Sequence, residues 1–149
     1  MVRFMSSIRS TVQERLMESS VSGTIAHGHL TATFCWDSII DKKLYETVLT
    51  LPKTIVDKML IPSDRDYQKR DEYYHAVQIG LAPEGKAAVW VSGVARGEPN
   101  YRIIPSVQKT VSGDILVICK GITRFSHGYE YGKDTENFIK GKKYPYGLW

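Results

Sequence analysis

The sequence predicts an α+β fold, in which a mainly antiparallel β-sheet, sandwich-like or a single curved sheet, carries two or three short helices. Apolar and polar residues alternate over 30–36 and again over 44–51, which is the period of a half-buried strand. Pro83, Glu84 and Gly85 separate two runs rich in branched and aromatic residues, which is typical of a β-hairpin. The 149 residues are 42% hydrophobic, enough for one continuous core.

The chain divides into a short N-terminal segment and one folded unit. Residues 1–23 are predicted to be a helical or flexible segment. Ile8, Val12 and Leu16 give only a weak amphipathic pattern there, and a polar break follows. Residues 24–149 are predicted to form a single β-rich domain, because no internal repeat or low-complexity tract divides them further.

The first part of this domain is predicted to be two antiparallel strands followed by a helix. In the strand 30–36 the even-numbered residues share one face, as the period of two requires. The strand 44–51 follows a short polar connection and pairs with it. Proline is tolerated in a first helical turn, so Pro52 opens a helix over 52–60, which Pro62 ends. The apolar stripe of this helix is Ile55, Val56, Met59 and Leu60.

The middle of the chain combines a charged segment with the hairpin. Residues 63–72 show no periodicity and hold seven charges of both signs, which predicts an exposed loop. In the second hairpin strand Val89 and Val91 share one face while Trp90 takes the other, so both faces carry apolar groups. Ser92 has valine where a hydrolase nucleophile would have a flanking glycine. We therefore interpret the chemistry of this stretch as packing.

The C-terminal third predicts two more strands and a helix. A brief strand over 101–105 and a polar turn at 112–114 precede "ILVIC", 115–119, a continuous apolar run of the kind found in inner strands. Asp134 is placed to cap a helix over "TENFIKG", and Gly141 stands where a left-handed residue would stop it.

Charge and cysteine content restrict the class of protein. The net charge of +4 is spread along the chain, which explains solubility without indicating nucleic-acid binding. No apolar run is long enough for a transmembrane helix, and the N-terminus lacks the apolar centre of a signal peptide, so the chain as written is expected in the cytoplasm. Cys35 and Cys119 are then expected as two buried thiols, and a bridge between them would require export.

Catalytic and metal-binding patterns are weak, so no catalytic residue, metal ligand or cofactor is predicted. His27 and His29 would share a strand face and could chelate a metal, but nothing marks a third ligand. A metal-binding domain or enzyme using this pair is therefore kept only as an alternative. A second alternative is nucleic-acid binding by the basic, aromatic C-terminus, in which Tyr144, Tyr146 or Trp149 would stack on bases. The competing interpretation is that these aromatic residues plug the sheet.

Three stretches in order resemble a known family. They are "LPKTIVDKM", "IGLAPEGKAAVWVSG" and "FIKGKKYPYGLW", and the resemblance runs from about Cys35 to Trp149. In them the chain is similar to the bacterial domain-of-unknown-function family 2931. The resemblance implies small lipoprotein-like proteins, often periplasmic, some of which act as immunity proteins against phospholipase effectors of the type VI secretion system. This chain departs from that pattern, because "TATFC" before Trp36 is not a lipid-attachment box.

The predicted function is therefore that of a bacterial antitoxin rather than an enzyme. The protein would bind and neutralise a cognate toxin, a type VI secretion phospholipase or lipase effector, by blocking its active site. Exposed loops with charged and aromatic anchors suit such a task, because a few desolvated aromatic or arginine contacts dominate most protein interfaces. The predicted partner-binding residues are Asp64, Arg65, Tyr67, Lys69, Arg70, Arg96, Glu98 and Tyr101. No nucleic-acid partner is expected, and the oligomeric state is left open.

Overall fold

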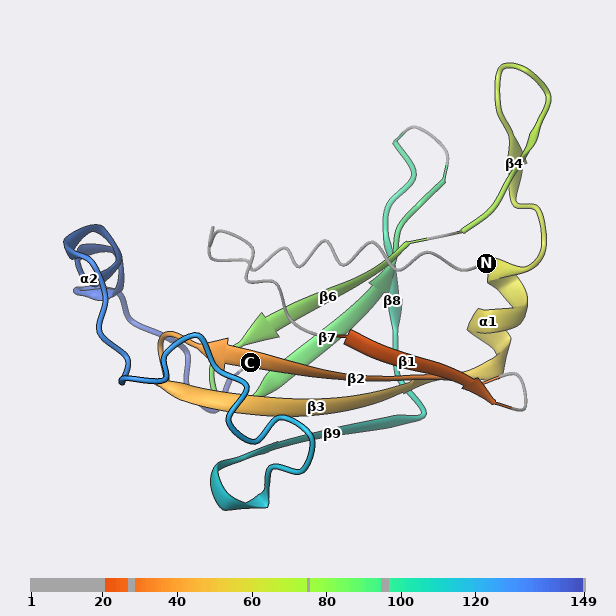
Figure 1. The fold of residues 1–149 in the computed structure, drawn as a ribbon. Helices are drawn as coiled ribbons and strands as arrows, with labels where there is room; N and C mark the ends of the chain where they lie inside the picture. The colour runs from red at the N-terminus through yellow and green to blue at the C-terminus, as the bar shows by residue number, and fades with distance from the viewer. Residues whose placement is uncertain (1–20, 27–28, 75, 95–96, 149) are drawn as a thin grey trace.

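The computed structural model describes residues 21–26, 29–74, 76–94 and 97–148. The predicted helical or flexible segment at the N-terminus therefore lies outside the described residues as far as residue 20. Among the described residues the fold has antiparallel strands in three sheets and two α-helices, which confirms the predicted α+β class (Figure 1).

The largest sheet contains both predicted N-terminal strands. Its strand order is β1-β2-β3-β9, and every pair is antiparallel. The strands are β1 (Val21–Ala26), β2 (His29–Ser38), β3 (Lys43–Leu51) and β9 (Val107–Ser112). The register places Trp36 opposite Tyr45, and their rings stack with centroids 4.7 Å apart. Trp36 Nε1 also donates to Thr47 Oγ1 at 2.9 Å, which satisfies the buried indole N–H.

The predicted hairpin belongs to a second sheet with the order β6-β7-β8. Its strands are β6 (Val77–Ala82), β7 (Lys86–Val91) and β8 (Tyr101–Ile103). Val89 and Val91 are buried as predicted, whereas Trp90 on the other face lies under the guanidinium of Arg102, 4.8 Å from the ring centroid. A third, two-stranded sheet consists of β4 (Asp64–Arg65) and β5 (Asp71–Glu72).

The core lies between the two larger sheets and is closed by the first helix. Even-numbered residues of β2 and odd-numbered residues of β3 meet the valines of β6 and β7 and Ile103 of β8 in one buried cluster. The helix α1 (Lys53–Met59) begins after Pro52 as predicted and adds Val56 and Met59 to this cluster. Leu60, predicted to belong to the same stripe, is exposed because the helix has already ended.

The C-terminal segment is attached to the other face of the large sheet. Cys35 and Cys119 form a disulfide with a Cα–Cα distance of 5.4 Å, so the expectation of two thiols is wrong. Beside the bridge, the buried carboxylate of Glu46 accepts the backbone N–H groups of Val117 and Cys119, both at 2.9 Å. Burial opposes ionisation, but these N–H donors outweigh it and hold the pKa of Glu46 below its ordinary value.

Asp37 provides a second attachment for the same segment. Its carboxylate accepts the hydroxyls of Thr123 at 2.7 Å and Tyr129 at 2.6 Å. Burial, followed by the hydrogen bond and the charge of Asp37, raises the pKa of the Tyr129 hydroxyl. A helix α2 (Lys133–Ile139) follows, and Gly141 with φ +83° stands just beyond it as predicted. Its N-cap is Gly132 rather than the predicted Asp134, which lies in the first turn.

Four segments differ from the sequence prediction. The break predicted before residue 24 overlaps the edge strand β1. The polar strand β9 was missed, and "ILVIC" is not an inner strand: a 3-10 turn (Gly113–Ile115) leads into an irregular loop that exposes most of these side chains. The charged stretch 63–72 is exposed as predicted, but it forms the hairpin β4–β5 rather than an irregular loop.

Candidate functional site

The tip of the β4–β5 hairpin is built around the side chain of Asp66. Its Oδ1 accepts the backbone N–H groups of Gln68 at 2.8 Å and Arg70 at 2.9 Å, and its Oδ2 accepts Arg70 Nε at 2.6 Å. Lys69 adopts the left-handed conformation with φ +60° that closes the turn. The N–H group of Arg70, followed by its guanidinium, holds the pKa of Asp66 below its usual range against partial burial. The charged residues of this segment therefore have a structural task.

The stem of the hairpin presents one aromatic side chain to solvent. Arg65 Nε and Asp71 Oδ1 lie 3.2 Å apart across the two strands, and Ser63 N donates to Glu72 O at 2.8 Å. Above this stem the side chain of Tyr67 is 90% exposed. The hairpin projects beyond both larger sheets at the upper right of Figure 1, so this tyrosine is held away from the body of the protein.

A polar and aromatic cluster lies at the base of the hairpin, two residues after β5. The hydroxyls of Tyr74 and Tyr101 both donate to Glu98 Oε1 at 2.8 Å, and Glu98 Oε2 accepts Val94 N at 2.7 Å. The two rings meet edge to face with centroids 5.7 Å apart. Hydrogen bonding, first with Tyr101 and then with Glu98, raises the pKa of Tyr74. This cluster ties the 94–101 connection to the foot of the hairpin.

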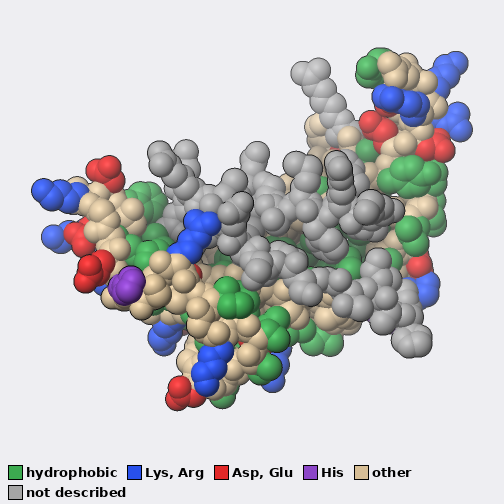
Figure 2. Space-filling view, in the orientation of Figure 1, with side chains coloured by type: hydrophobic (Ala, Val, Ile, Leu, Met, Phe, Trp, Pro, Cys, Tyr) green, Lys and Arg blue, Asp and Glu red, His purple; other side chains and the backbone are tan. Residues whose placement is uncertain are grey.

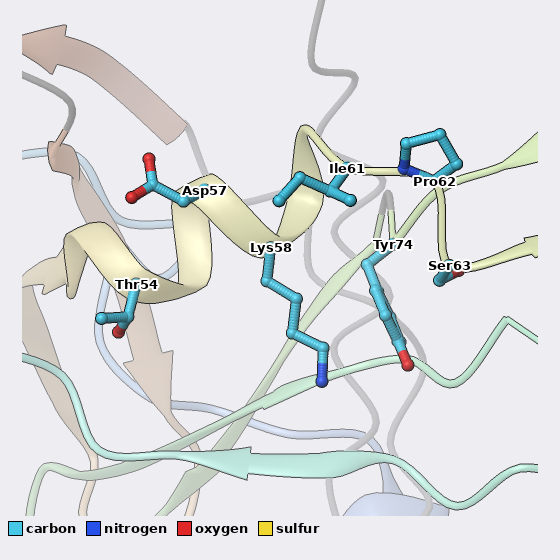
Figure 3. Close-up of a pocket in the computed structure, with 7 residues that line it drawn as sticks. All are labelled: Thr54, Asp57, Lys58, Ile61, Pro62, Ser63 and Tyr74. Atoms are coloured by element: carbon cyan, nitrogen blue, oxygen red, sulfur yellow. The ribbon is translucent and has the colours of Figure 1, made fainter.

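A groove opens between α1 and the foot of the hairpin (Figure 3). Its volume is about 550 Å³, and it is lined by Thr54, Asp57, Lys58, Ile61, Pro62, Ser63 and Tyr74. Lys58 Nζ lies 4.8 Å from the ring centroid of Tyr74 and 4.3 Å from that of Tyr101, so its ammonium group makes cation–π contacts with both rings. Asp57 is paired with Lys53 Nζ at 2.6 Å. The groove therefore combines an aromatic floor, one cation and an apolar rim.

The structure brings together most of the predicted partner-binding residues. Five of them, Asp64, Arg65, Tyr67, Lys69 and Arg70, belong to the hairpin, and Glu98 and Tyr101 lie at its foot. Arg96 lies outside the described residues. Sequence reasoning missed Lys58 and Tyr74, which join the two predicted loops. The signal available was the aromatic pair Tyr73 and Tyr74 directly after the charged segment.

The described residues of the alternative functions form no metal site of their own. His27 lies outside the described residues, and His29 is exposed at the start of β2. Among the described residues, no group of three His, Cys, Asp or Glu side chains is arranged to hold a metal ion. In the C-terminal tail, Tyr144 and Tyr146 meet edge to face with centroids 6.2 Å apart. Nucleic-acid binding by this tail stays a prediction.

The hairpin turn 83–85 has a structural role that links two of the motifs quoted above. Glu84 N donates to Asp41 Oδ2 at 2.7 Å, and Gly147 N of the C-terminal motif donates to Glu84 Oε2 at 2.6 Å. Asp41 Oδ2 also accepts the hydroxyl of Tyr45 at 3.0 Å. Gly85, with φ +69°, passes so close to Tyr45 that an added Cβ would lie 3.0 Å from the ring. This turn therefore joins the β2–β3 connection to the tail.

Comparison with known proteins identifies a family without assigning a function. A family model described as a protein of unknown function (DUF2931) matches residues 30–147. No curated protein and no solved structure matches the chain. In the part of the chain that the structure describes, none of the helices has the length and apolar composition needed to cross a membrane.

Proposed function

The chain belongs to the DUF2931 family, and on that premise we propose that it is a protein-binding domain that acts as an immunity protein. It binds a cognate toxin, a phospholipase effector of a type VI secretion system, and blocks the active site of that enzyme. The observation that carries this proposal is Tyr67, a 90% exposed aromatic side chain on a braced hairpin. A side chain this exposed buries almost no surface in the isolated fold and so adds little to its stability, whereas tyrosine is a common anchor of protein interfaces.

The hairpin is braced by contacts among its own residues. Its tip is closed by Asp66, and its stem carries the ion pair between Arg65 and Asp71. Exposed ion pairs add little stability, but together with the backbone contacts they limit the conformations that the loop can adopt. A preorganised loop loses less entropy on binding, so more of its contact energy appears as affinity.

The groove supplies a second contact next to the hairpin. Lys58, held over the rings of Tyr74 and Tyr101, offers a cation to an acidic side chain of the partner. Ile61 adds exposed apolar surface at the rim of the groove. In this proposal the projecting hairpin enters the substrate cleft of the lipase and the groove receives the edge of that cleft, so substrate is excluded sterically.

The disulfide indicates where this protein would act. Bridges such as Cys35–Cys119 form and persist in oxidising compartments and are rare in the cytosol. We therefore propose an exported, periplasmic location in place of the cytoplasmic one expected from the sequence as written. This location also agrees with the lipoprotein-like character implied by the family resemblance.

The experiment first expresses the proteins encoded beside this gene and then tests any lipase among them for binding and inhibition by the full chain. We expect the full chain to co-purify with that lipase and to inhibit its hydrolysis of phospholipid. Tyr67→Ala should raise the dissociation constant on the order of 100-fold, because hot-spot aromatic residues contribute about 2–4 kcal/mol to the binding free energy. Tyr67→Phe should retain most of the affinity, since the ring supplies most of the contact area.

Leu148→Ala is the matched control, because Leu148 is 84% exposed and lies in the C-terminal tail rather than in the hairpin. It should leave the affinity unchanged. Absence of binding to the lipase would remove the proposal, and equal affinities for Tyr67→Ala and the wild type would remove the hairpin as its anchor.

A further inference from the structure

The loop that follows β9 exposes a cluster of aliphatic side chains. We call residues 113–122 the aliphatic loop. Four aliphatic residues within eight consecutive positions are between 49% and 76% exposed: Ile115, Val117, Ile118 and Ile122. Figure 2 shows hydrophobic side chains gathered below the centre of the view, over the region that this loop occupies in Figure 1. Contiguous exposed apolar surface of this kind marks a contact site.

Several backbone N–H groups of the aliphatic loop are paired with protein acceptors. The N–H groups of Val117 and Cys119 donate to the buried carboxylate of Glu46. Leu116 N donates to Gly113 O at 3.2 Å, and Ile122 N donates to Cys119 O at 2.9 Å. The disulfide at Cys119 fixes the loop to β2. Burial in an apolar medium would therefore leave these N–H groups paired, which removes the main penalty that an ordinary solvated loop would meet.

Basic residues outnumber acidic ones in and next to the aliphatic loop. Between residues 107 and 124 the chain has Lys109, Lys120 and Arg124 against the single acidic residue Asp114. Lys109 lies opposite Val48 in the register, on the sheet face that also carries Glu46 and the aliphatic loop. Lys109 and Lys120 are exposed and take part in none of the ion pairs formed by the described residues. The surface is therefore complementary to a layer of negative charge.

The composition of this surface differs from that of the hairpin. Protein interfaces favour tyrosine, tryptophan and arginine and contain few lysines. The aliphatic loop has no aromatic residue and combines branched aliphatic side chains with lysine. That combination suits a lipid interface, where aliphatic groups enter the acyl boundary and lysines attract anionic headgroups.

We propose that the aliphatic loop docks this protein on an anionic phospholipid surface. Val117 and Ile118 enter the boundary between headgroups and acyl chains, and Lys109 and Lys120 face the lipid phosphates. The inference does not depend on the identity of any toxin, because it uses a surface other than the hairpin and its groove.

The test is flotation of the full chain with lipid vesicles. One set of vesicles contains phosphatidylcholine alone, and the other contains phosphatidylcholine and phosphatidylglycerol in equal parts. We expect binding to the anionic vesicles that decreases with added salt, and on the order of tenfold weaker binding to the neutral ones. A Val117→Ser/Ile118→Ser variant should lose on the order of tenfold in affinity for the anionic vesicles. Lys109→Gln/Lys120→Gln should lose a similar factor.

Ile104→Ser is the matched control. Ile104 is 84% exposed and lies in the connection between β8 and β9, at the opposite end of β9 from the aliphatic loop. This variant should bind vesicles as the wild type does. All changed side chains are exposed, and an unchanged circular dichroism spectrum verifies that each variant folds.

Two results would overturn the inference. One is absence of flotation with anionic vesicles at low salt, and the other is equal flotation of the wild type and Val117→Ser/Ile118→Ser. If that variant instead lost its affinity for the lipase and kept its affinity for vesicles, the aliphatic loop would be a protein contact and the lipid assignment would be wrong. Vesicle flotation requires no lipase, so a failure of the proposed function leaves its outcome readable.

Discussion

Removing the disulfide should destabilise this fold more than any other change to the C-terminal third. Cys35 and Cys119 are both buried, and their bridge closes a loop with a sequence separation of 84. Chain-entropy theory for a loop of that length gives about 4.5 kcal/mol at 25 °C, most of it from restriction of the unfolded chain. The retained contacts of Glu46 and Asp37 do not replace this term, because they act only in the folded state.

The assay is urea unfolding of the oxidised wild type and of the Cys35→Ala/Cys119→Ala variant, followed by tryptophan fluorescence. We expect the variant to lose about 3–4.5 kcal/mol of unfolding free energy, with the lower value allowing for a compact unfolded state. Limited proteolysis should cut the variant first after residue 112, where the segment leaves β9. A loss below about 1 kcal/mol, or two free thiols in unfolded protein isolated from an oxidising compartment, would refute the reasoning.

Three further changes test contacts in different parts of the fold. Glu46→Ala should lower the free energy of unfolding by about 3 kcal/mol, because it leaves buried N–H groups unpaired. Since folding lowers the pKa of Glu46, the stability that this carboxylate contributes should be lost as the pH falls below its ordinary pKa of 4.5. Chemical denaturation should therefore show a weaker acid dependence in Glu46→Gln than in the wild type. Gly85→Ala should lower the free energy of unfolding by about 1–3 kcal/mol, seen as a lower melting temperature, because φ is +69° and the added Cβ would press on Tyr45. Gly93→Ala should displace the carbonyl of Glu98, which would lie 2.6 Å from the new Cβ, and so weaken lipase binding measured by calorimetry while Tyr67 itself is unchanged.

The strands that could be predicted were those with a strong local pattern. β2, β3 and the β6–β7 hairpin are confirmed, because alternating hydrophobicity and a Pro-Glu-Gly turn are written within a few neighbouring residues. β9 was missed because its residues are mostly polar, and it is a strand only because β3 offers it an edge to pair with.

The run "ILVIC" shows the limit of pattern reasoning. Its apolar composition indicates a buried strand, yet in the fold most of its side chains face solvent. The N–H groups of Val117 and Cys119 donate instead to Glu46, which lies 71 residues before Val117 in the chain. Hydrophobicity alone cannot anticipate a buried carboxylate from another strand competing for the same N–H groups.

The candidate site was predictable only where its residues have a local signal in the sequence. The exposure of the charged stretch follows from its composition, and Tyr67 could be chosen from the sequence. Lys58 and Tyr74 could not, because α1 and the 94–101 connection meet the foot of the hairpin only in the folded chain.

By itself the sequence determined the α+β class, the antiparallel pairs β2–β3 and β6–β7 and the exposure of the charged stretch, because periodicity, turn residues and charge act over a few neighbouring positions. Only the tertiary structure decided that Cys35 meets Cys119, that Tyr74 and Tyr101 share Glu98, and that the aliphatic loop faces outward. Those outcomes depend on contacts between distant segments, whose geometry exists only once the two sheets have packed.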